Sequence, residues 1–251
     1  MNLPKIIAGP CVIESQELLD TVARRIVEIN NTLGTDIIFK ASFDKANRTS
    51  LSSYRGVGLD KGLEMLAEIR SKYGLRVLTD IHEAWQARPV GEVVDVLQIP
   101  AFLCRQTDLL VQAAKTGKVV NIKKAQFLSG VDMRYPYEKA MQSGAKEVWL
   151  TERGNMYGYN NLVVDFRNIA DMRNIADTVV MDCTHSVQRP GAAGGKTAGN
   201  REFVPAMALA AKAFGANGYF FEVHPAPDTA LSDGPNMLYL DELENVVKSL
   251  L

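Results

Sequence analysis

The strongest constraint on the fold is a set of eight short apolar, mostly β-branched runs that recur along the whole chain. Each run is continuous rather than alternating, which is typical of strands covered by helices on one face and packed into a core on the other. Segments with a helical pattern separate them. The eight runs are KIIAG (5–9), DIIFK (36–40), RVLTD (76–80), DVLQI (95–99), VVNIK (119–123), EVWLT (147–151), TVVMD (178–182) and GYFFE (218–222).

Two of the intervening segments carry clear helix signals. Over residues 59–73 the apolar positions step by three or four, and Gly74 follows where a helix often ends on a left-handed residue. Before QELLDTVARRIVEI, Ser15 is the expected N-cap, and Glu17 lies in the first turn, where the helix dipole favours a carboxylate. The chain is therefore expected to alternate strands and helices.

Eight β–α units in 251 residues predict an α/β protein with a single domain, a (β/α)8 TIM barrel covering residues 1–251. A doubly wound open sheet is the alternative, but it usually has fewer strands and a glycine fingerprint after the first one. Here the first run leads into AGPCVIES, which has no GxGxxG pattern. The barrel is the preferred interpretation.

Composition and charge exclude several classes of function. A formal net charge of −1 gives no electrostatic footprint for nucleic acid, and no apolar run approaches the about 20 residues of a membrane span. Cys11, Cys104 and Cys183 form no CxxC pair, and an odd number of cysteines fits a reducing compartment. MNLPKIIAGP shows no signal-peptide cleavage pattern. We expect a cytoplasmic protein without nucleic-acid or membrane partners.

Polar or reactive side chains stand where the predicted strands meet their following loops. In a (β/α)8 barrel these C-terminal strand ends form one rim, and active sites lie there. A single polar residue at such a position is more often a solvated loop residue, but eight together favour a site. They are Cys11, Lys40, Asp80, Gln98, Lys123, Arg153, His185 and Glu222.

Basic residues at this rim predict anion binding. Like charges crowded into a cleft repel each other unless anions or acidic neighbours compensate them. Arginine binds phosphate or carboxylate through a planar fork, whereas lysine acts as a point charge. The cluster is large enough for a doubly anionic substrate and a second phosphate, with Lys/Glu pairs on a solvated rim as the alternative. Its members are Lys40, Lys45, Arg48, Lys123, Lys124 and Arg153.

Two further inferences concern this rim. Lys123 rather than Lys124 should face the barrel interior, because it shares a strand face with Asn121. PGAAGGKTAGN resembles a phosphate loop, but Pro190 stands where the GxxxxGK[ST] pattern needs glycine. Residues 191–199 are interpreted as a mobile loop that closes over a substrate, or equally as an ordinary flexible connection.

Four potential metal ligands are far apart in sequence but should meet in space. Barrel closure makes the last strand a neighbour of both the first and the seventh, so their ends become adjacent. A thiolate, an imidazole and two carboxylates form a mixed site that suits a divalent transition ion, which would also deprotonate the thiol. Cys183 and Cys104 are poorer candidates, because Cys183 should point toward the helices. The four ligands are Cys11, His185, Glu222 and Asp233.

Six stretches give the chain a resemblance to the 3-deoxy-D-manno-octulosonate 8-phosphate synthase family, over about residues 6 to 240. KANR is the discriminating motif, since the related heptulosonate synthases carry KPRTS at the corresponding place. The stretches are FKASFDKANRTS, QIPAFLCRQTDLL, VNIKKAQF, GYNNLVVDFRNI, MDCTHSVQ and FFEVHPAP with SDGP.

The resemblance implies condensation of phosphoenolpyruvate with D-arabinose 5-phosphate and water, for lipopolysaccharide biosynthesis, by a homotetramer without an organic cofactor. Cysteine rather than asparagine at Cys11 implies the metal-dependent branch, with Zn, Fe, Mn, Co or Cd as the ion. Many relatives begin with a β-hairpin that plugs the barrel floor. This chain is expected to lack that N-terminal hairpin and to close the floor in another way.

The resemblance also assigns ligands to positions in this chain. The aldose phosphate is assigned to Asn47, Arg48 and Thr49, where the family usually has serine at Thr49. Phosphoenolpyruvate is assigned to Lys40, Lys45, Gln98, Lys123 and Arg153.

The expected reaction joins C3 of the enol phosphate, a weak nucleophile, to an aldehyde held close to it. Water then quenches the positive character at C2, and the metal ion orients that water or polarises the aldehyde. Asp80 and Asp233 are possible proton carriers, and the expected catalytic set also contains Lys45 and His185. Three alternatives stay open: a heptulosonate 7-phosphate synthase, an aldolase that forms a Schiff base on Lys123, and a phosphosugar-binding module without activity.

Overall fold

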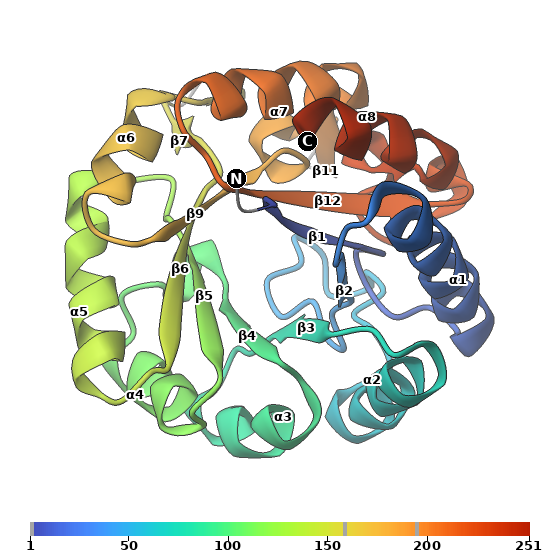
Figure 1. Cartoon of the computed structure of the whole chain (residues 1–251), viewed down its shortest axis with the longest axis horizontal. Helices are drawn as coiled ribbons and strands as arrows, with labels where there is room; N and C mark the ends of the chain where they lie inside the picture. Colours follow the sequence, from blue (N-terminus) through green and yellow to red (C-terminus); the bar gives the residue numbers. More distant parts are fainter. Residues whose placement is uncertain (1–2, 158–159, 194–195) are drawn as a thin grey trace.

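The computed structural model describes residues 3–157, 160–193 and 196–251, and it contains a closed barrel of eight parallel strands (Figure 1). Closure is made by β1, which pairs with β12 as well as with β2. The predicted barrel is confirmed, and the open doubly wound sheet is excluded. In order around the barrel, the strands are β1 (Lys5–Gly9), β2 (Ile38–Lys40), β3 (Val77–Asp80), β4 (Val96–Ile99), β5 (Val119–Lys123), β6 (Glu147–Glu152), β9 (Thr178–Asp182) and β12 (Gly218–His224).

Helices follow the barrel strands and form the outer layer (Figure 1). The predicted caps are confirmed: the Ser15 hydroxyl accepts the Leu18 N–H at 3.1 Å, and Gly74 is left-handed with φ 66°. Within the described part of the chain, no helix has both the length and the apolar character required to cross a membrane. The helices are α1 (Gln16–Leu33), α2 (Leu59–Tyr73), α3 (Ala87–Val93), α4 (Thr107–Lys115), α5 (Arg134–Gln142), α6 (Arg167–Arg173), α7 (Val204–Ala213) and α8 (Leu243–Leu250).

Short 3-10 turns connect many of these elements. Two of them matter for the site, because η4 begins at His185 and η7 follows directly after Asp233. A short strand, β13 (Leu238–Tyr239), pairs with the end of β12. The turns are η1 (Ala84–Gln86), η2 (Ala101–Leu103), η3 (Val131–Met133), η4 (His185–Val187), η5 (Arg201–Phe203), η6 (Pro227–Thr229), η7 (Gly234–Asn236) and η8 (Leu240–Glu242).

The inside of the barrel is divided into an apolar floor and a polar upper layer. Side chains alternate between the two faces of a strand, so residues two positions apart point into the barrel together. The floor contains the fully buried Trp149, whose indole N–H donates to Glu147 Oε1 at 2.6 Å. β1, the first described strand, already belongs to the barrel. The floor cluster comprises Ile7, Ile38, Leu78, Val96, Trp149, Val180 and Phe220, with Val119 packed against it.

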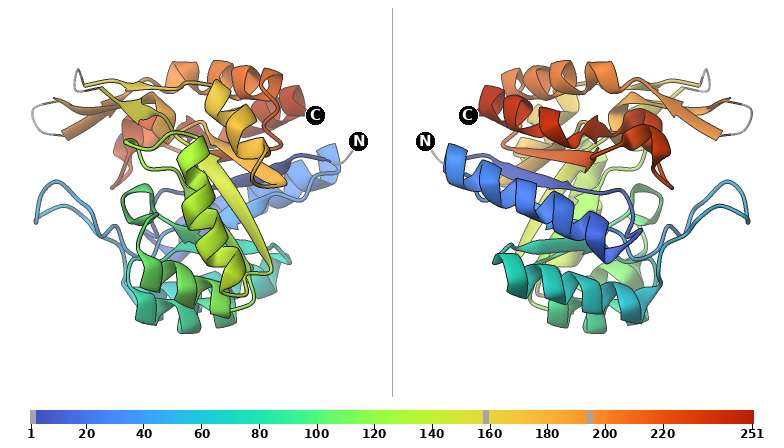
Figure 2. Two further views of the ribbon diagram at one scale, coloured as in Figure 1. Left: turned by 90° about the vertical axis from the view of Figure 1, so that its left-hand side faces the viewer. Right: turned by 90° about the vertical axis from the view of Figure 1, so that its right-hand side faces the viewer.

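Three segments project from the end of the barrel where the strands end, while both chain termini lie at the opposite end (Figure 2). They are the β2–α2 loop and two antiparallel hairpins, β7 (Asn155–Met156) with β8 (Leu162–Val163), and β10 (Gln188–Ala193) with β11 (Lys196–Gly199). The segment 191–199, predicted as a mobile loop or a flexible connection, belongs to the second of these hairpins in its described part. Main-chain pairing forms a hairpin there although the side chains are small; residues 194 and 195 lie outside the described residues.

Candidate active site

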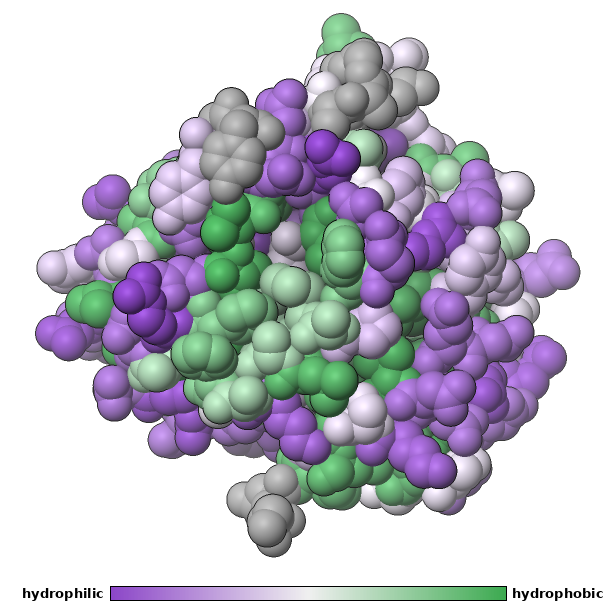
Figure 3. All heavy atoms as spheres, turned by 90° about the horizontal axis from the view of Figure 1, so that it is seen from above, coloured by the Kyte–Doolittle hydropathy of each residue, from purple (hydrophilic) through white to green (hydrophobic). Residues whose placement is uncertain are grey.

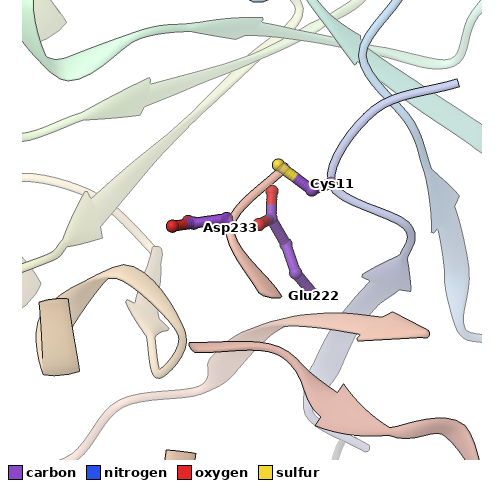
Figure 4. A group of neighbouring side chains, drawn as sticks. All are labelled: Cys11, Glu222 and Asp233. Carbon is purple, nitrogen blue, oxygen red and sulfur yellow. The ribbon is translucent and has the colours of Figure 1, made fainter. Parts of the chain in front are cut away.

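A thiol and two carboxylates meet at the C-terminal rim of the barrel. Ligand atoms of Cys11, Glu222 and Asp233 all lie within 4.8 Å of one another. The register of β1 against β12 places Gly9 beside Glu222, which brings Cys11 to the same rim. Figure 4 shows the sulfur of Cys11 and the carboxylate of Glu222 directed toward each other. Barrel closure therefore creates this cluster from the two ends of the sequence.

His185 completes the predicted set of four side chains. Its Nε2 lies 3.5 Å from Glu222 Oε2 and 3.4 Å from Asp233 Oδ2. Its Nδ1 faces Asp182 Oδ2 at 2.8 Å, and its main-chain N–H donates to Asp182 Oδ1 at 2.9 Å. This contact favours a proton on Nδ1, which leaves Nε2 as the ring nitrogen that would bind a cation. His185 therefore lies beside two members of the three-residue cluster, Glu222 and Asp233.

The cluster has the chemistry of a cation site. Glu222 Oε2 is buried and has no hydrogen-bond partner among the described residues. Burial and the neighbouring Glu222 raise the pKa of the Cys11 thiol to about 12, so it stays protonated unless a cation is bound. In this form it donates to Ser232 Oγ at 3.1 Å. Sulfur, imidazole nitrogen and carboxylate oxygen together suit a divalent transition ion, so the residues fit such a group.

Lysines compensate the buried carboxylate of the cluster. Lys40 is almost fully buried, and its Nζ lies 2.8 Å from Glu222 Oε1 and 2.8 Å from the Cys11 carbonyl oxygen. Lys45 Nζ lies 3.6 Å from the same carboxylate oxygen. Burial alone would raise the pKa of Glu222, but Lys40, His185 and Lys45 hold it well below its ordinary value. Glu222 is therefore ionised at neutral pH.

Lys123 lies on the barrel interior, as its position in the strand predicts. Its Nζ forms an ion pair of 2.5 Å with Asp182 Oδ2 and lies 3.8 Å from the centre of the Phe220 ring. Burial lowers the pKa of Lys123, and Asp182 opposes that change. Lys124 points the other way, where it is buried 3.4 Å from Glu152. The predicted orientation of the two lysines is confirmed.

One terminal nitrogen of the Arg153 guanidinium group makes a hydrogen bond, and the other is available to a ligand. Nη2 donates to Gln188 Oε1 at 2.9 Å, and the buried Nη1 has no partner in the part of the chain described. On the neighbouring strands β4 and β5, the Gln98 side chain accepts from Asn121 Nδ2 at 3.2 Å. Asn121 in turn accepts from the Thr151 hydroxyl at 2.6 Å. These contacts hold Gln98 at the rim together with the basic groups.

Asp80 presents a carboxylate oxygen without a partner. Its Oδ2 lies 3.0 Å from His82 Nε2, whereas its buried Oδ1 makes no hydrogen bond within the described residues. Burial alone would raise the pKa of Asp80, but His82, and after it Lys45 and Lys40, hold that pKa well below its usual range. The group is therefore ionised, and its Oδ1 is able to accept a hydrogen bond.

The predicted aldose-phosphate residues lie on the outer rim, in the β2–α2 loop. Arg48 donates to Ser232 Oγ at 2.8 Å and to the Leu231 carbonyl at 3.2 Å. It thereby ties this loop to the segment that carries Asp233. Asn47 and Thr49 are exposed on either side of Arg48. Only Arg48 of the three makes side-chain contacts toward the cluster in the described structure.

Three residues that support the site were not predicted as site residues from the sequence. Asp182 contacts both Lys123 and His185, and its inward position in the strand was a usable signal. Gln188 bridges Arg153 and Asp233, and Ser232 bridges Cys11 and Arg48. Gln188 and Ser232 carry no local pattern, because only the folding of the rim loops gives them partners.

Fold and site together define a (β/α)8-barrel enzyme with a cation-rich rim around a thiol, imidazole and carboxylate cluster. The family model described as the DAHP synthetase I family matches residues 2–250. Relatives named 2-dehydro-3-deoxyphosphooctonate aldolase include one from Fusobacterium nucleatum, 56% identical over 243 residues (97% of this chain and 87% of the relative). Relatives of the same name come from Synechococcus, 54% identical over 246 residues (98% and 87%), and Helicobacter hepaticus, 52% identical over 256 residues (98% and 94%).

The chain belongs to the DAHP synthetase I family and, within it, to the group of the 2-dehydro-3-deoxyphosphooctonate aldolases. This group is the 3-deoxy-D-manno-octulosonate 8-phosphate synthases under another name, so the resemblance predicted from the KANR stretch and its companions is confirmed.

Proposed function

We propose that this chain condenses phosphoenolpyruvate with D-arabinose 5-phosphate and water, giving 3-deoxy-D-manno-octulosonate 8-phosphate and inorganic phosphate for lipopolysaccharide synthesis. The observation that carries the proposal is the meeting of buried cations and the acid–thiol cluster at one barrel rim. Lys40 and Lys123 each lie within 2.8 Å of a buried carboxylate oxygen there. Such a rim suits a substrate with both a carboxylate and a phosphate, because both groups need cationic partners.

The inner cations supply the phosphoenolpyruvate subsite in this proposal. Arg153 Nη1 is a buried donor without a partner in the described residues, which favours an anion as its ligand. The outer loop with Asn47, Arg48 and Thr49 receives the phosphate of the aldose. Two separated phosphate subsites align C3 of the enol phosphate with the aldehyde. The inner subsite comprises Lys40, Lys45, Gln98, Lys123 and Arg153.

Acid–base groups stand at the same rim. Bond formation at C3 leaves positive character at C2, and the attacking water must lose a proton before phosphate leaves. Asp80 is the proposed proton carrier, because it is ionised and its free oxygen can accept a hydrogen bond from that water. Lys45, His185 and Asp233 complete the proposed catalytic set around the cluster.

A divalent ion is the proposed cofactor, with Zn, Fe, Mn, Co or Cd as candidates. Cys11, His185, Glu222 and Asp233 would hold it, and the unpartnered Glu222 Oε2 supports that assignment. When bound, the ion supplies Lewis acidity that orients a water or polarises the aldehyde. The protein itself fixes the ligands: Asp182 orients His185, and Lys40 orients Glu222.

Phosphate release from phosphoenolpyruvate tests the proposal directly. We expect release with arabinose 5-phosphate, little with erythrose 4-phosphate, loss on chelation and recovery when metal is restored. Cys11→Ala should lose both the bound ion, measured by elemental analysis, and the activity. A preference for erythrose 4-phosphate would instead indicate a heptulosonate synthase. Full activity of a metal-free Cys11→Ala protein would remove the metal from the mechanism.

A Schiff-base aldolase is the second candidate, because burial lowers the pKa of Lys123. Its ion pair of 2.5 Å with Asp182 favours the protonated amine, which cannot attack a carbonyl. Borohydride reduction in the presence of pyruvate separates the two mechanisms by mass spectrometry. The condensation proposed above predicts no adduct on Lys123.

A cytoplasmic homotetramer is the proposed working form. The surface around α7 supports self-association, since Leu209 on the helix and Phe203 and Phe214 at its two ends are 46–53% exposed. Figure 3, which looks onto this side of the molecule, shows apolar residues gathered there. Light scattering after gel filtration measures the mass directly, and a monomer of 27.6 kDa would contradict this part of the proposal.

A further inference from the structure

Gln188 joins the anion-binding arginine to the acid–thiol cluster. We propose that Gln188 is a positioning residue that couples the orientation of Arg153 to that of Asp233. The inference rests on the proposed function, because the anion that reports on Arg153 is phosphoenolpyruvate.

The side-chain amide of Gln188 is fixed at both ends. Its Oε1 accepts from Arg153 Nη2 at 2.9 Å. Its Nε2 donates to Asp233 Oδ2 at 2.9 Å and to Asp233 Oδ1 at 3.2 Å. An arginine only donates and a carboxylate only accepts, so the amide can satisfy both partners in one orientation alone. Hydrogen bonds to charged groups are also the stronger kind.

The backbone segments that carry Gln188 and Asp233 also contact each other. Gln188 begins β10 and pairs with Gly199 on β11. Gly199 lies so close to Asn236 that a Cβ would come 1.5 Å from Asn236 Oδ1. Asn236 Nδ2 in turn donates to Asp233 Oδ1 at 2.9 Å, and Asp233 has the left-handed φ of 55°. The hairpin and the Asp233 turn therefore form one packed unit.

This arrangement leaves Arg153 half restrained. Gln188 accepts a hydrogen bond from Nη2, whereas the buried Nη1 has no hydrogen-bond partner among the described residues. A planar fork binds an anion well only when its orientation is fixed beforehand. If Gln188 loses its contact with Asp233, it restrains Arg153 less well. The affinity for the anion should then depend on Asp233 through Gln188.

A double-mutant cycle tests this coupling with metal-free protein in excess chelator. The dissociation constant of phosphoenolpyruvate is measured by calorimetry for wild type, Gln188→Met, Asp233→Ala and the double variant. We expect Gln188→Met to weaken binding about tenfold when Asp233 is present, the size expected for one charge-assisted hydrogen bond. In the Asp233→Ala background the same change should weaken binding less than about threefold.

Two further variants test whether a change in phosphoenolpyruvate affinity comes from the Gln188 contacts or from a general disturbance of the hairpin. Arg189→Met changes the exposed neighbour in the same hairpin and should leave the affinity unchanged. Gln188→Glu keeps an acceptor for Arg153 but opposes Asp233, so adding Asp233→Ala to Gln188→Glu should strengthen binding, whereas Asp233→Ala in the wild type should weaken it. Thermal unfolding of every variant verifies that it is folded.

The outcomes separate the coupling from the proposed function. An equal effect of Gln188→Met in both backgrounds, or no effect in either, overturns the coupling. Wild-type protein that binds phosphoenolpyruvate but releases no phosphate with arabinose 5-phosphate contradicts the function alone, and the cycle still decides the coupling. Wild-type protein that does not bind phosphoenolpyruvate overturns both.

Discussion

At the scale of single residues, the rim is a set of buried charges that compensate one another. Lys40 lies against Glu222, and Lys123 lies against Asp182. An unpaired ion in such a position would cost several kcal/mol, so each partner makes the other tolerable. The acids belong to β9 and β12, whereas the lysines belong to β2 and β5. An incoming anion therefore meets cations that already have anionic neighbours.

The pKa shifts of these acids predict how stability depends on pH. Burial would raise the pKa of both carboxyl groups, but His185 and Lys123 around Asp182, and Lys40 and His185 around Glu222, lower it below the ordinary 3.8 and 4.5. The stability they contribute is therefore complete above those ordinary values. It is lost as the pH falls through them toward the folded-state values.

Urea unfolding of metal-free protein at a series of pH values from 6 to 3 measures this loss. The free energy of unfolding should decrease with falling pH, and Asp182→Asn should make the decrease shallower. Glu64→Gln, which changes an exposed acid, is the control and should keep the wild-type slope. A stability that stays constant down to pH 3, or an unchanged slope for Asp182→Asn, would contradict the assignment.

At the scale of elements, the β10–β11 hairpin shows where local sequence is insufficient. Its glycines and alanines have little strand propensity, so the segment resembles a loop. Pairing of Gln188 with Gly199 and of Arg189 with Ala198 makes it a hairpin. Contact with the turn after Asp233 gives it a fixed place at the rim.

Gly199→Ala tests whether that close contact matters. The new Cβ would displace the fully buried Asn236 and break its hydrogen bond to Asp233. We expect a loss of about 1–3 kcal/mol in the free energy of unfolding and a fall of about ten- to a hundred-fold in the rate of phosphate release. Ala198→Ser, at the neighbouring position on the other face, should change neither. Unaltered stability and rate in Gly199→Ala would show that the rim tolerates a looser hairpin.

At the scale of the whole molecule, the barrel separates stability from chemistry along its axis. The floor is apolar and includes the large side chains of Trp149 and Phe220. The polar residues lie in the layers above it, on the same strands. Parallel strands with period-two alternation produce this layering, because each inward position belongs to one level of the barrel.

Replacing the floor tryptophan should affect stability more than chemistry. Trp149→Ala leaves a large buried cavity and is expected to cost about 3–5 kcal/mol in the free energy of unfolding. Trp85 is 64% exposed, so Trp85→Ala is a matched control with an expected change of about 0.5 kcal/mol or less. Urea denaturation of both variants measures the difference. Similar losses in the two variants would mean that the floor is not a single packed layer.

Much of this protein was predictable from the sequence because its signals are local and periodic. The eight strand runs, the caps at Ser15 and Gly74, and the inward side of Lys123 all follow from residue spacing. The charged residues at the strand ends also predicted that the site lies at the C-terminal rim of the barrel. Each of these features depends only on neighbouring residues and on the geometry of a strand or helix.

Tertiary structure decided which of those side chains touch. Closure of β1 on β12 brings Cys11 to Glu222, and only the folded rim gives Gln188 and Ser232 their partners. The sequence alone determined the number of barrel strands and the side chains that each one carries to its end. The pairing of charges across the barrel was decided in space, because the partners lie on different strands and no local pattern links them.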